Sequence, residues 1–241
     1  TGSDEDGDGS QDNPFTTIQH GIDASSDGDT VLVSAGTYVE NINFNGKNIA
    51  VIGEDRETTI IDGDSVSQVI NLQNGEDSTT VIKNFTLRNG IGLEVNGSAI
   101  LMDGGDYGPK LENLCITQNY DNAITSFGST FSLKNSRLIN NYNRALSIQH
   151  PQLSTIDNVL ITGNGRGVEI NGGAAPVFTN VTISNHVSEI TYVVFIRSST
   201  PTFKNTFIVG NKSYKTSQIK KTQSIQFKTA FNAGLTISTG K

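Results

Sequence analysis

Apolar residues recur along this chain at a fixed interval, within short stretches in which apolar and polar residues alternate. Six segments share one pattern: Asn is followed three residues later by Leu or Ile, and by a second Asn two or three residues further on. Such repetition is typical of a solenoid, in which each repeat contacts its neighbours. The leading residues, 29, 22, 23, 22 and 25 positions apart, are Asn84, Asn113, Asn135, Asn158, Asn180 and Asn205. We interpret Asn48 to Val51 as an earlier copy, with room for an insertion before Asn84.

Each repeat contains two further short alternating stretches. One precedes the leading Asn and usually begins with Pro; the other follows it and includes Ile100, Ile124, Leu146, Val168 and Val194. Three short strands per repeat, separated by Gly, Asn and Pro, predict a triangular coil. Asn suits its corners because it tolerates left-handed backbone angles. The period is too short for a propeller blade, and the Leu-rich consensus of leucine-rich repeats is missing. We therefore predict an all-β fold, a right-handed parallel β-helix of about eight coils of 22–25 residues.

The N-terminal end carries signals for a cap. Thr16 to Gln19 has the pattern of a capping box, and Phe15, Ile18 and Ile22 fall on one helical face. These features predict a short amphipathic capping helix over residues 16–25. The predicted organisation is a single β-helix domain, 1–241. It comprises an acidic loop and cap helix at 1–28, coils at 29–211 and an irregular basic C-terminal segment at 212–241.

Composition narrows the classes of function. Hydrophobic residues make up only 34% of the chain, which a solenoid tolerates because each coil buries a thin central stack. Cys115 is the single cysteine, so neither an intrachain disulfide nor a zinc cluster is expected. No apolar run approaches about 18 residues, so we predict no membrane span. The net charge of −7 argues against a nucleic-acid partner.

The charge is distributed unevenly. Residues 1–30 contain eight acids and no Lys or Arg, whereas residues 212–241 contain six lysines and no acid. One interpretation is a metal-binding loop at one end and a solvated tail at the other. The alternative is a rod with oppositely charged ends that associates head to tail.

The acidic leader offers candidate metal ligands. Asp4, Asp6, Asp8 and Asp12 lie in a Gly-rich loop, with carboxylates at nearly alternate positions. Calcium prefers such flexible sets of oxygen ligands. We predict a structural calcium ion here, with a merely solvated acidic loop as the alternative.

The stretch from Asp12 to Gly63 contains Pro-Phe-Thr-Thr-Ile-Gln, Gly-Asp-Thr-Val-Leu-Val, Gly-Thr-Tyr-Val-Glu and Thr-Ile-Ile-Asp-Gly. It resembles the N-terminal segment of the pectin lyase-like β-helix superfamily, which includes pectate and alginate lyases, pectin methylesterases and polygalacturonases. The resemblance implies the fold and a secreted or cell-surface protein that binds or modifies carbohydrate. The known catalytic motifs of the methylesterases, pectate lyases and polygalacturonases are absent, so no specific enzyme family is matched.

One surface of the predicted helix suits a sugar chain. If the five residues from Ile100 to Val194 point inward, their neighbours Leu101, Thr125, Ser147, Glu169 and Phe195 point outward. The next outward column is Asp103, Phe127, Gln149, Asn171 and Arg197. Arginines pair with carboxylates, and aromatic rings stack on sugar rings. We predict substrate-binding roles for Asp103, Phe127, Gln149, Glu169, Asn171, Phe195 and Arg197.

Arg144 and Arg166 lie at the corner before this surface and are the candidate catalytic residues. In lyases of the superfamily it resembles, a Lys or Arg takes the proton beside a uronate carboxylate that calcium or Arg neutralises. The sharpest hypothesis is therefore an acidic-polysaccharide lyase. The alternative is a non-catalytic structural or adhesive surface module that stacks head to tail.

Overall fold

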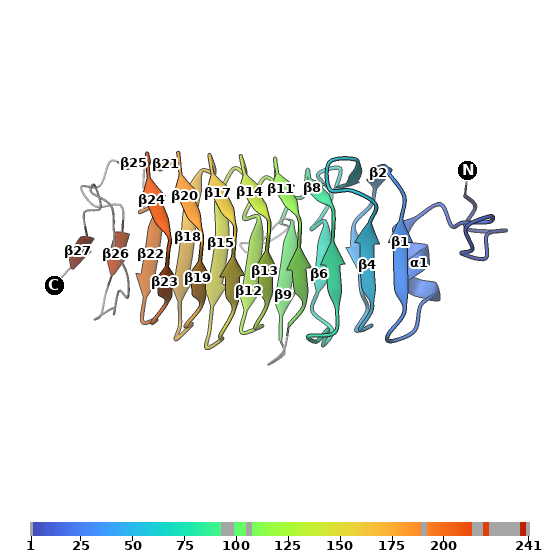
Figure 1. The fold of residues 1–241 in the computed structure, drawn as a ribbon, viewed down its shortest axis with the longest axis horizontal. Coiled ribbons are helices and arrows are strands. Elements are labelled where there is room, and N and C mark those ends of the chain that lie inside the picture. The colour runs from blue at the N-terminus through green and yellow to red at the C-terminus, as the bar shows by residue number, and fades with distance from the viewer. Residues whose placement is uncertain are drawn as a thin grey trace.

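The computed structural model describes residues 2–92, 99–104, 108–188, 192–213, 219–221 and 237–239. Strands from successive coils align into three long parallel sheets that run the length of an elongated molecule (Figure 1). From β1 to β26, consecutive strands lie in different sheets, and strands of the same sheet pair with their counterparts one coil away. The predicted right-handed parallel β-helix is confirmed, with about seven turns.

Sheet A contains the strands that precede the leading asparagines. Its order is β1 (Thr30–Val33), β4 (Ala50–Gly53), β7 (Val81–Lys83), β10 (Lys110–Glu112), β13 (Ser132–Lys134), β16 (Thr155–Asp157), β19 (Val177–Thr179) and β23 (Thr202–Lys204).

Sheet B contains the strands that follow them. Its order is β2 (Gly36–Val39), β5 (Thr59–Asp62), β8 (Thr86–Arg88), β11 (Cys115–Thr117), β14 (Arg137–Ile139), β17 (Leu160–Thr162), β20 (Thr182–Ser184) and β24 (Phe207–Val209).

Sheet C contains the third strand of each coil. In chain order these are β3 (Ile42–Asn43), β6 (Ile70–Leu72), β9 (Ile100–Asp103), β12 (Ile124–Phe127), β15 (Arg144–Gln149), β18 (Arg166–Asn171), β22 (Val194–Arg197), β26 (Ile219–Lys221) and β27 (Ile237–Thr239). A fourth, two-stranded sheet pairs β21 (Val187–Ser188) with β25 (Lys212–Ser213).

The core is a narrow column inside the coil. In sheet B, successive coils contribute Leu87, Ile116, Leu138 and Ile161, all of which are fully buried. Because each strand sends only alternate residues inward, a low hydrophobic content still fills this column.

The corner between sheets A and B is built by the leading asparagines, as predicted. All six have positive φ angles, between 44° and 64°. Their side chains bond along the axis: Asn113 Nδ2 donates to Asn84 Oδ1 at 2.9 Å, and Asn158 Nδ2 donates to Asn135 Oδ1 at 2.8 Å. The amide ladder therefore ties neighbouring coils together where the backbone turns most sharply.

The assignment of Asn48 as an earlier copy is wrong. Val51 belongs to sheet A, whereas the matching residue Leu87 belongs to sheet B. Gly53 occupies the corner instead, and its carbonyl accepts from Asn84 Nδ2 at 3.0 Å. The insertion lies after it, at residues 54–58, where Glu57 forms an ion pair with Arg137. Residues 48–51 match the sequence pattern of the repeat, but they lie in a different sheet from the six other copies.

A second, buried ladder lies at the corner before sheet C. Asn119, Asn141 and Asn164 each donate a side-chain hydrogen bond to a carbonyl one coil back, and Asn211 does the same. His186 takes the equivalent place in its own coil and is fully buried. Its Nε2 lies 3.3 Å from the Ile161 carbonyl oxygen, and its Nδ1 lies 3.0 Å from that of Asn164.

A capping helix is present, but it is shorter than predicted. α1 spans Ile18–Ala24, and its N-cap is Thr17 rather than Thr16. In a capping box, the Gln19 side chain would bond back to the N-cap residue. Here the Glu40 carboxylate bonds to the first turn instead: it accepts from the Ile18 and Gln19 amides, at 2.9 Å each. A distant acid thus satisfies the first turn, which frees the Gln19 side chain for another contact.

Much of the basic C-terminal segment, 212–241, lies outside the described residues. Within the described part, no helix is long and apolar enough to cross a membrane.

Candidate functional site on the outward face of sheet C

The strand register brings the predicted site residues together. Ser147 lies beside Glu169, Phe127 beside Gln149, and Arg144 beside Arg166. Asn171 lies beside Arg197, and Asp103 beside Phe127. All nine candidates therefore sit on five neighbouring strands, β9, β12, β15, β18 and β22, on the face directed away from the core. Their roles stay predictions.

An ion pair lies at the centre of this face. Arg144 Nε is 2.6 Å from Glu169 Oε2, and Asn171 Nδ2 donates to Glu169 Oε1 at 3.2 Å. The two ionic side chains are only 25% and 16% exposed. Burial lowers the pKa of the Arg144 guanidinium, Glu169 acts against this shift, and the nearby charge of Arg166 lowers the pKa further. The pair is thus a partly desolvated charge cluster with its carboxylate held from two sides.

Arg166, unlike Arg144, has no acidic partner among the residues that the structure describes. In the described part of the chain, its half-buried guanidinium makes no ion pair or side-chain hydrogen bond, although it lies one coil from Arg144. The side chain of Arg197, exposed at the end of β22, also makes no ion pair or side-chain hydrogen bond with the described residues. A guanidinium with unused donors matches a carboxylate in geometry as well as charge. The face therefore presents two cations available to an anionic ligand.

Neutral polar groups fill the space around the charges. Gln149 Nε2 donates to Ser147 Oγ at 3.0 Å, and Asn122 Nδ2 donates to Thr125 Oγ1 at 3.1 Å. Ser147 and Thr125 consequently lie on the outward face, as predicted, yet are 2% and 0% exposed. Leu101 is also buried, at 6%. The outward direction of this column was predicted, whereas the burial of these three residues was not, because strand alternation gives a direction and not the exposed fraction of a side chain.

The predicted aromatic contacts lie at the two sides of the charge cluster. Phe127 packs against His150, with ring centroids 6.2 Å apart, and His150 has the positive φ of a turn residue. Phe195 is half-buried beside Glu169. Asp103 is exposed at the end of β9, and the loop after it lies partly outside the described residues.

A pair of stacked tyrosines was missed by sequence reasoning. The rings of Tyr120 and Tyr142 are nearly parallel, at 2°, with centroids 5.2 Å apart. They are 51% and 68% exposed, at the corner that leads into β12 and β15. Both directly follow a ladder asparagine, Asn119 or Asn141, so alignment of the coils on that ladder reveals the pair.

In the acidic leader, the Asp4 carboxylate is occupied by hydrogen bonds to the residues before α1. Asp4 accepts from the Thr16 amide at 2.7 Å, the Thr17 amide at 3.1 Å and the Thr17 hydroxyl at 2.8 Å. Asp8 accepts from the Ser10 amide at 2.9 Å. Among the described residues, no three His, Cys, Asp or Glu side chains gather in a metal-binding arrangement. Calcium bound by Asp4, Asp6, Asp8 and Asp12 stays a prediction, and no step below depends on it.

Comparison with solved structures identifies the fold. A pectin methylesterase from Yersinia enterocolitica matches with a TM-score of 0.54 and 12% identity, covering 93% of this chain and 94% of that one. The A-module of mannuronan C-5 epimerase AlgE4 from Azotobacter vinelandii matches with a TM-score of 0.52 and 18% identity, covering 87% and 71%. No protein-family model and no curated protein matches the sequence. The chain thus has the pectin lyase-like β-helix fold, as the sequence predicted.

Proposed function

We propose that the outward face of sheet C binds an acidic polysaccharide and acts on it as a lyase. The observation that carries this proposal is the Arg166 guanidinium, which has no ion-pair partner among the described residues and lies beside the Arg144–Glu169 ion pair. Two structures that share the fold are named for action on polysaccharides, pectin and mannuronan. Acidic polysaccharides are extracellular, so the proposal includes a secreted or cell-surface location.

Binding rests on complementary charge and shape. Arg166 and Arg197 pair with carboxylates of the polymer, because a guanidinium donates two parallel hydrogen bonds to one carboxylate. Gln149 and Asn171 offer amide groups to sugar hydroxyls, and Phe127 and Phe195 offer ring edges or faces. Asp103 lies at the margin of the face, where it limits the approach of further carboxylates. An extended sheet face suits a polymer better than a small compact ligand.

The proposed reaction is β-elimination. Arg166 neutralises the uronate carboxylate, which acidifies the proton on the adjacent carbon C5. Arg144, after releasing its own proton to solvent, accepts the C5 proton as a neutral guanidine; the C–H electron pair forms the C4–C5 double bond, and the bond from C4 to the glycosidic oxygen breaks. The departing oxygen takes a proton from solvent. Burial and the charge of Arg166 lower the pKa of Arg144 and so favour the neutral base, whereas Glu169 opposes this shift while it positions the side chain.

The test is incubation with polymannuronate, pectate and chondroitin, with and without calcium, while unsaturated uronates are followed by ultraviolet absorbance. We expect product from at least one polymer. Replacing Arg166→Gln should weaken polymer binding by about tenfold or more, since a charge-assisted pair contributes about 1.5–3 kcal/mol. Arg137→Gln, on sheet B, is the matched control and should bind like the wild type.

The outcomes separate the two functions. Binding without product on any polymer contradicts the lyase and leaves a non-catalytic carbohydrate-binding or adhesive module, which the absent catalytic motifs favour. Equal polymer binding by the Arg166→Gln and wild-type proteins contradicts the proposed site itself.

A further inference from the structure

The N-terminal end of the solenoid closes one of its three sheet edges. Gln19, on α1, pairs with the first strand of sheet C through its side-chain amide. Its Oε1 accepts from the Asn43 backbone N–H at 2.8 Å, and its Nε2 donates to the Asn43 carbonyl at 3.0 Å. The side chain therefore substitutes for a neighbouring strand, and β3 offers no free edge at Asn43.

The first strand of sheet A has no such cover. The carbonyls of Asp29 and Val33 accept from the amides of β4 and the residue after it. Since the backbone groups of successive strand residues point to opposite sides, Thr30 and Leu32 direct theirs away from β4. Within the described ranges, β1 is the outermost strand of sheet A, and neither residue's backbone has a partner on that side.

The first strand of sheet B is open in the same way. The Gly36 amide donates to Thr58, and the Glu40 amide donates to Asp62, so both face β5. Thr37 and Val39 therefore direct their backbone groups outward. Leu32 and Val39 are also 78% and 63% exposed, so two apolar side chains lie on unpaired edges. Proteins usually blunt such edges, because they pair readily with another chain.

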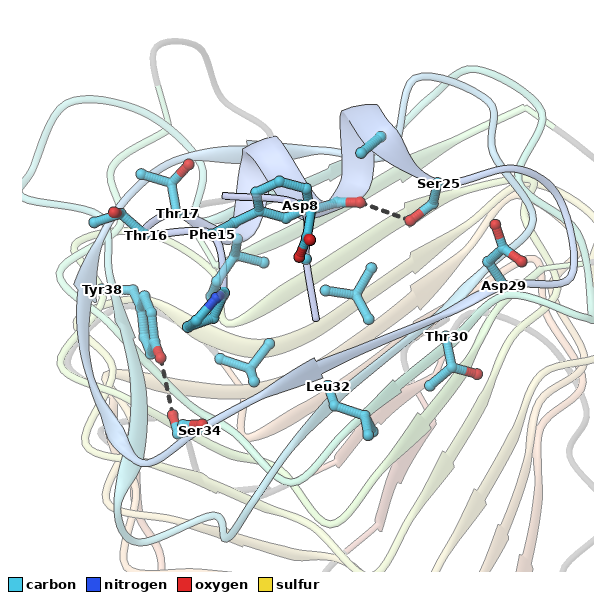
Figure 2. Close-up of a pocket in the computed structure, with 17 residues that line it drawn as sticks. Asp8, Phe15, Thr16, Thr17, Ser25, Asp29, Thr30, Leu32, Ser34 and Tyr38 are labelled. Atoms are coloured by element: carbon cyan, nitrogen blue, oxygen red, sulfur yellow. Dashed lines mark hydrogen bonds between the residues drawn. The ribbon is translucent and has the colours of Figure 1, made fainter. Parts of the chain in front are cut away.

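A cavity of about 460 Å³ runs beside β1, between this strand and the acidic leader with α1 (Figure 2). Phe15, Ile18 and Tyr38 contribute apolar wall, and the Tyr38 hydroxyl donates to the Ser34 carbonyl at 3.0 Å. Asp8 and Asp29 contribute the charged groups of the lining, and none of the lysines or arginines that the structure describes lines the cavity. The groove thus combines a strand edge, apolar wall and negative charge, which suits an extended basic peptide and repels an acidic sugar chain.

We infer that the edge of β1 is a docking site for the basic C-terminal segment of a second copy of this chain, which adds to sheet A as an extended strand. The docking stretch is the part of residues 212–241 outside β25, β26 and β27, because these three strands pair within their own molecule. Charge complementarity identifies the occupant: residues 1–30 carry eight acids and no Lys or Arg, and residues 212–241 carry six lysines and no acid. Main-chain hydrogen bonds to Thr30 and Leu32 supply the pairing, as in other β-strand additions. The contact joins unlike ends of two molecules, so it extends into chains unless it closes into a ring.

The experiment combines sedimentation velocity with amide hydrogen exchange measured by NMR. At low salt, rising protein concentration should give species larger than dimers and slow exchange at Thr30 and Leu32. Leu32→Lys, which places a positive charge on the edge, should weaken association by about tenfold or more. Leu153→Lys is the matched control, because Leu153 is 70% exposed elsewhere and should associate like the wild type. High salt should dissociate the wild type, because exposed charges are screened.

Three results overturn the inference. They are a wild type that stays monomeric at low salt and high concentration, association without protection of the Thr30 and Leu32 amides, and a Leu32→Lys protein that associates like the wild type. Circular dichroism of Leu32→Lys checks that the coil is intact, which is expected because Leu32 contributes nothing to the core.

Discussion

His186 occupies a position that neighbouring coils fill with asparagine. Both of its ring nitrogens face backbone carbonyl oxygens, yet the side chain is fully buried. Burial lowers its pKa below the ordinary value of 6.5, and the hydrogen bonds to Asn164 and Ile161 only partly offset this. The folded protein therefore favours the neutral ring, which can donate to one of the two carbonyls but not to both.

This arrangement predicts acid sensitivity. Because the folded-state pKa of His186 is below its unfolded value, the unfolded chain binds the proton first as the pH falls. The contribution of neutral His186 is therefore present above about pH 6.5 and is lost below it, with a limiting slope of about 1.4 kcal/mol per pH unit. Urea unfolding from pH 8 to 5 should show a shallower decline for His186→Asn. Identical slopes would contradict the assignment.

The Arg144–Glu169 pair gives a second prediction at this scale. Glu169→Gln leaves a mostly buried guanidinium without its charge partner, and should lower the free energy of unfolding by about 1–2 kcal/mol, discounted from the cost in fully buried pairs. Glu112→Gln is the control, since its partner Lys83 lies at 3.5 Å and both side chains are more than a third exposed. That variant should change stability by less than about 0.5 kcal/mol in the same denaturant titration. Equal losses in both variants would show that Arg144 does not depend on Glu169.

At the scale of elements, α1 is held at both ends by the following coil. Glu40 accepts from its first turn, and Lys47 Nζ donates to the carbonyls of Ile22, Asp23 and Ser25 at 2.6–2.8 Å. An acid at the N-terminus and a base at the C-terminus both complement the helix dipole. The pair compensates for a helix too short to be stable alone.

Lys47→Met should therefore loosen the cap. We expect a loss of about 1–2 kcal/mol, because three carbonyls lose their donor, two of them in part-buried hydrogen bonds. Hydrogen exchange should accelerate in α1 and β1 and remain unchanged in the central coils. Lys134→Met, an exposed lysine on sheet A, is the control and should leave both regions as they are. Uniform acceleration through the whole solenoid would contradict a role confined to the cap.

Sequence reasoning located elements whose signals are local and repeated. The corner asparagines, the three strands per coil and the outward columns all follow from the period. Sequence reasoning did not predict contacts between residues far apart in the chain. Glu40 caps a helix about twenty residues away, and no local motif indicates that contact. His186 was missed because it departs from asparagine, and it is found only when coils are aligned on the preceding Ile. Thr125 and Ser147 point outward and are nevertheless buried, which strand alternation alone does not predict.

At the scale of the whole molecule, a parallel solenoid turns a one-dimensional repeat into a long, regular face. On sheet C, residues 22–26 positions apart in the chain become neighbours from β9 to β22, so the site is assembled from one or two side chains per coil. This explains why no compact catalytic motif is needed in the sequence to place Arg144, Arg166, Glu169 and Asn171 together. The first and last segments of the chain carry opposite charges, acidic at 1–30 and basic at 212–241.

The central claim is that the outward face of sheet C, through Arg166, receives the carboxylates of an acidic polysaccharide. The most direct measurement is NMR of the arginine side-chain Nε–H signals during titration with an oligomannuronate or oligogalacturonate. The structure predicts that the Arg166 signal shifts first, with Arg197 and the backbone amides of β15 and β18 following, and that the Arg137 signal on sheet B does not move. Shifts confined to other faces, or none with any acidic oligosaccharide, would contradict the claim.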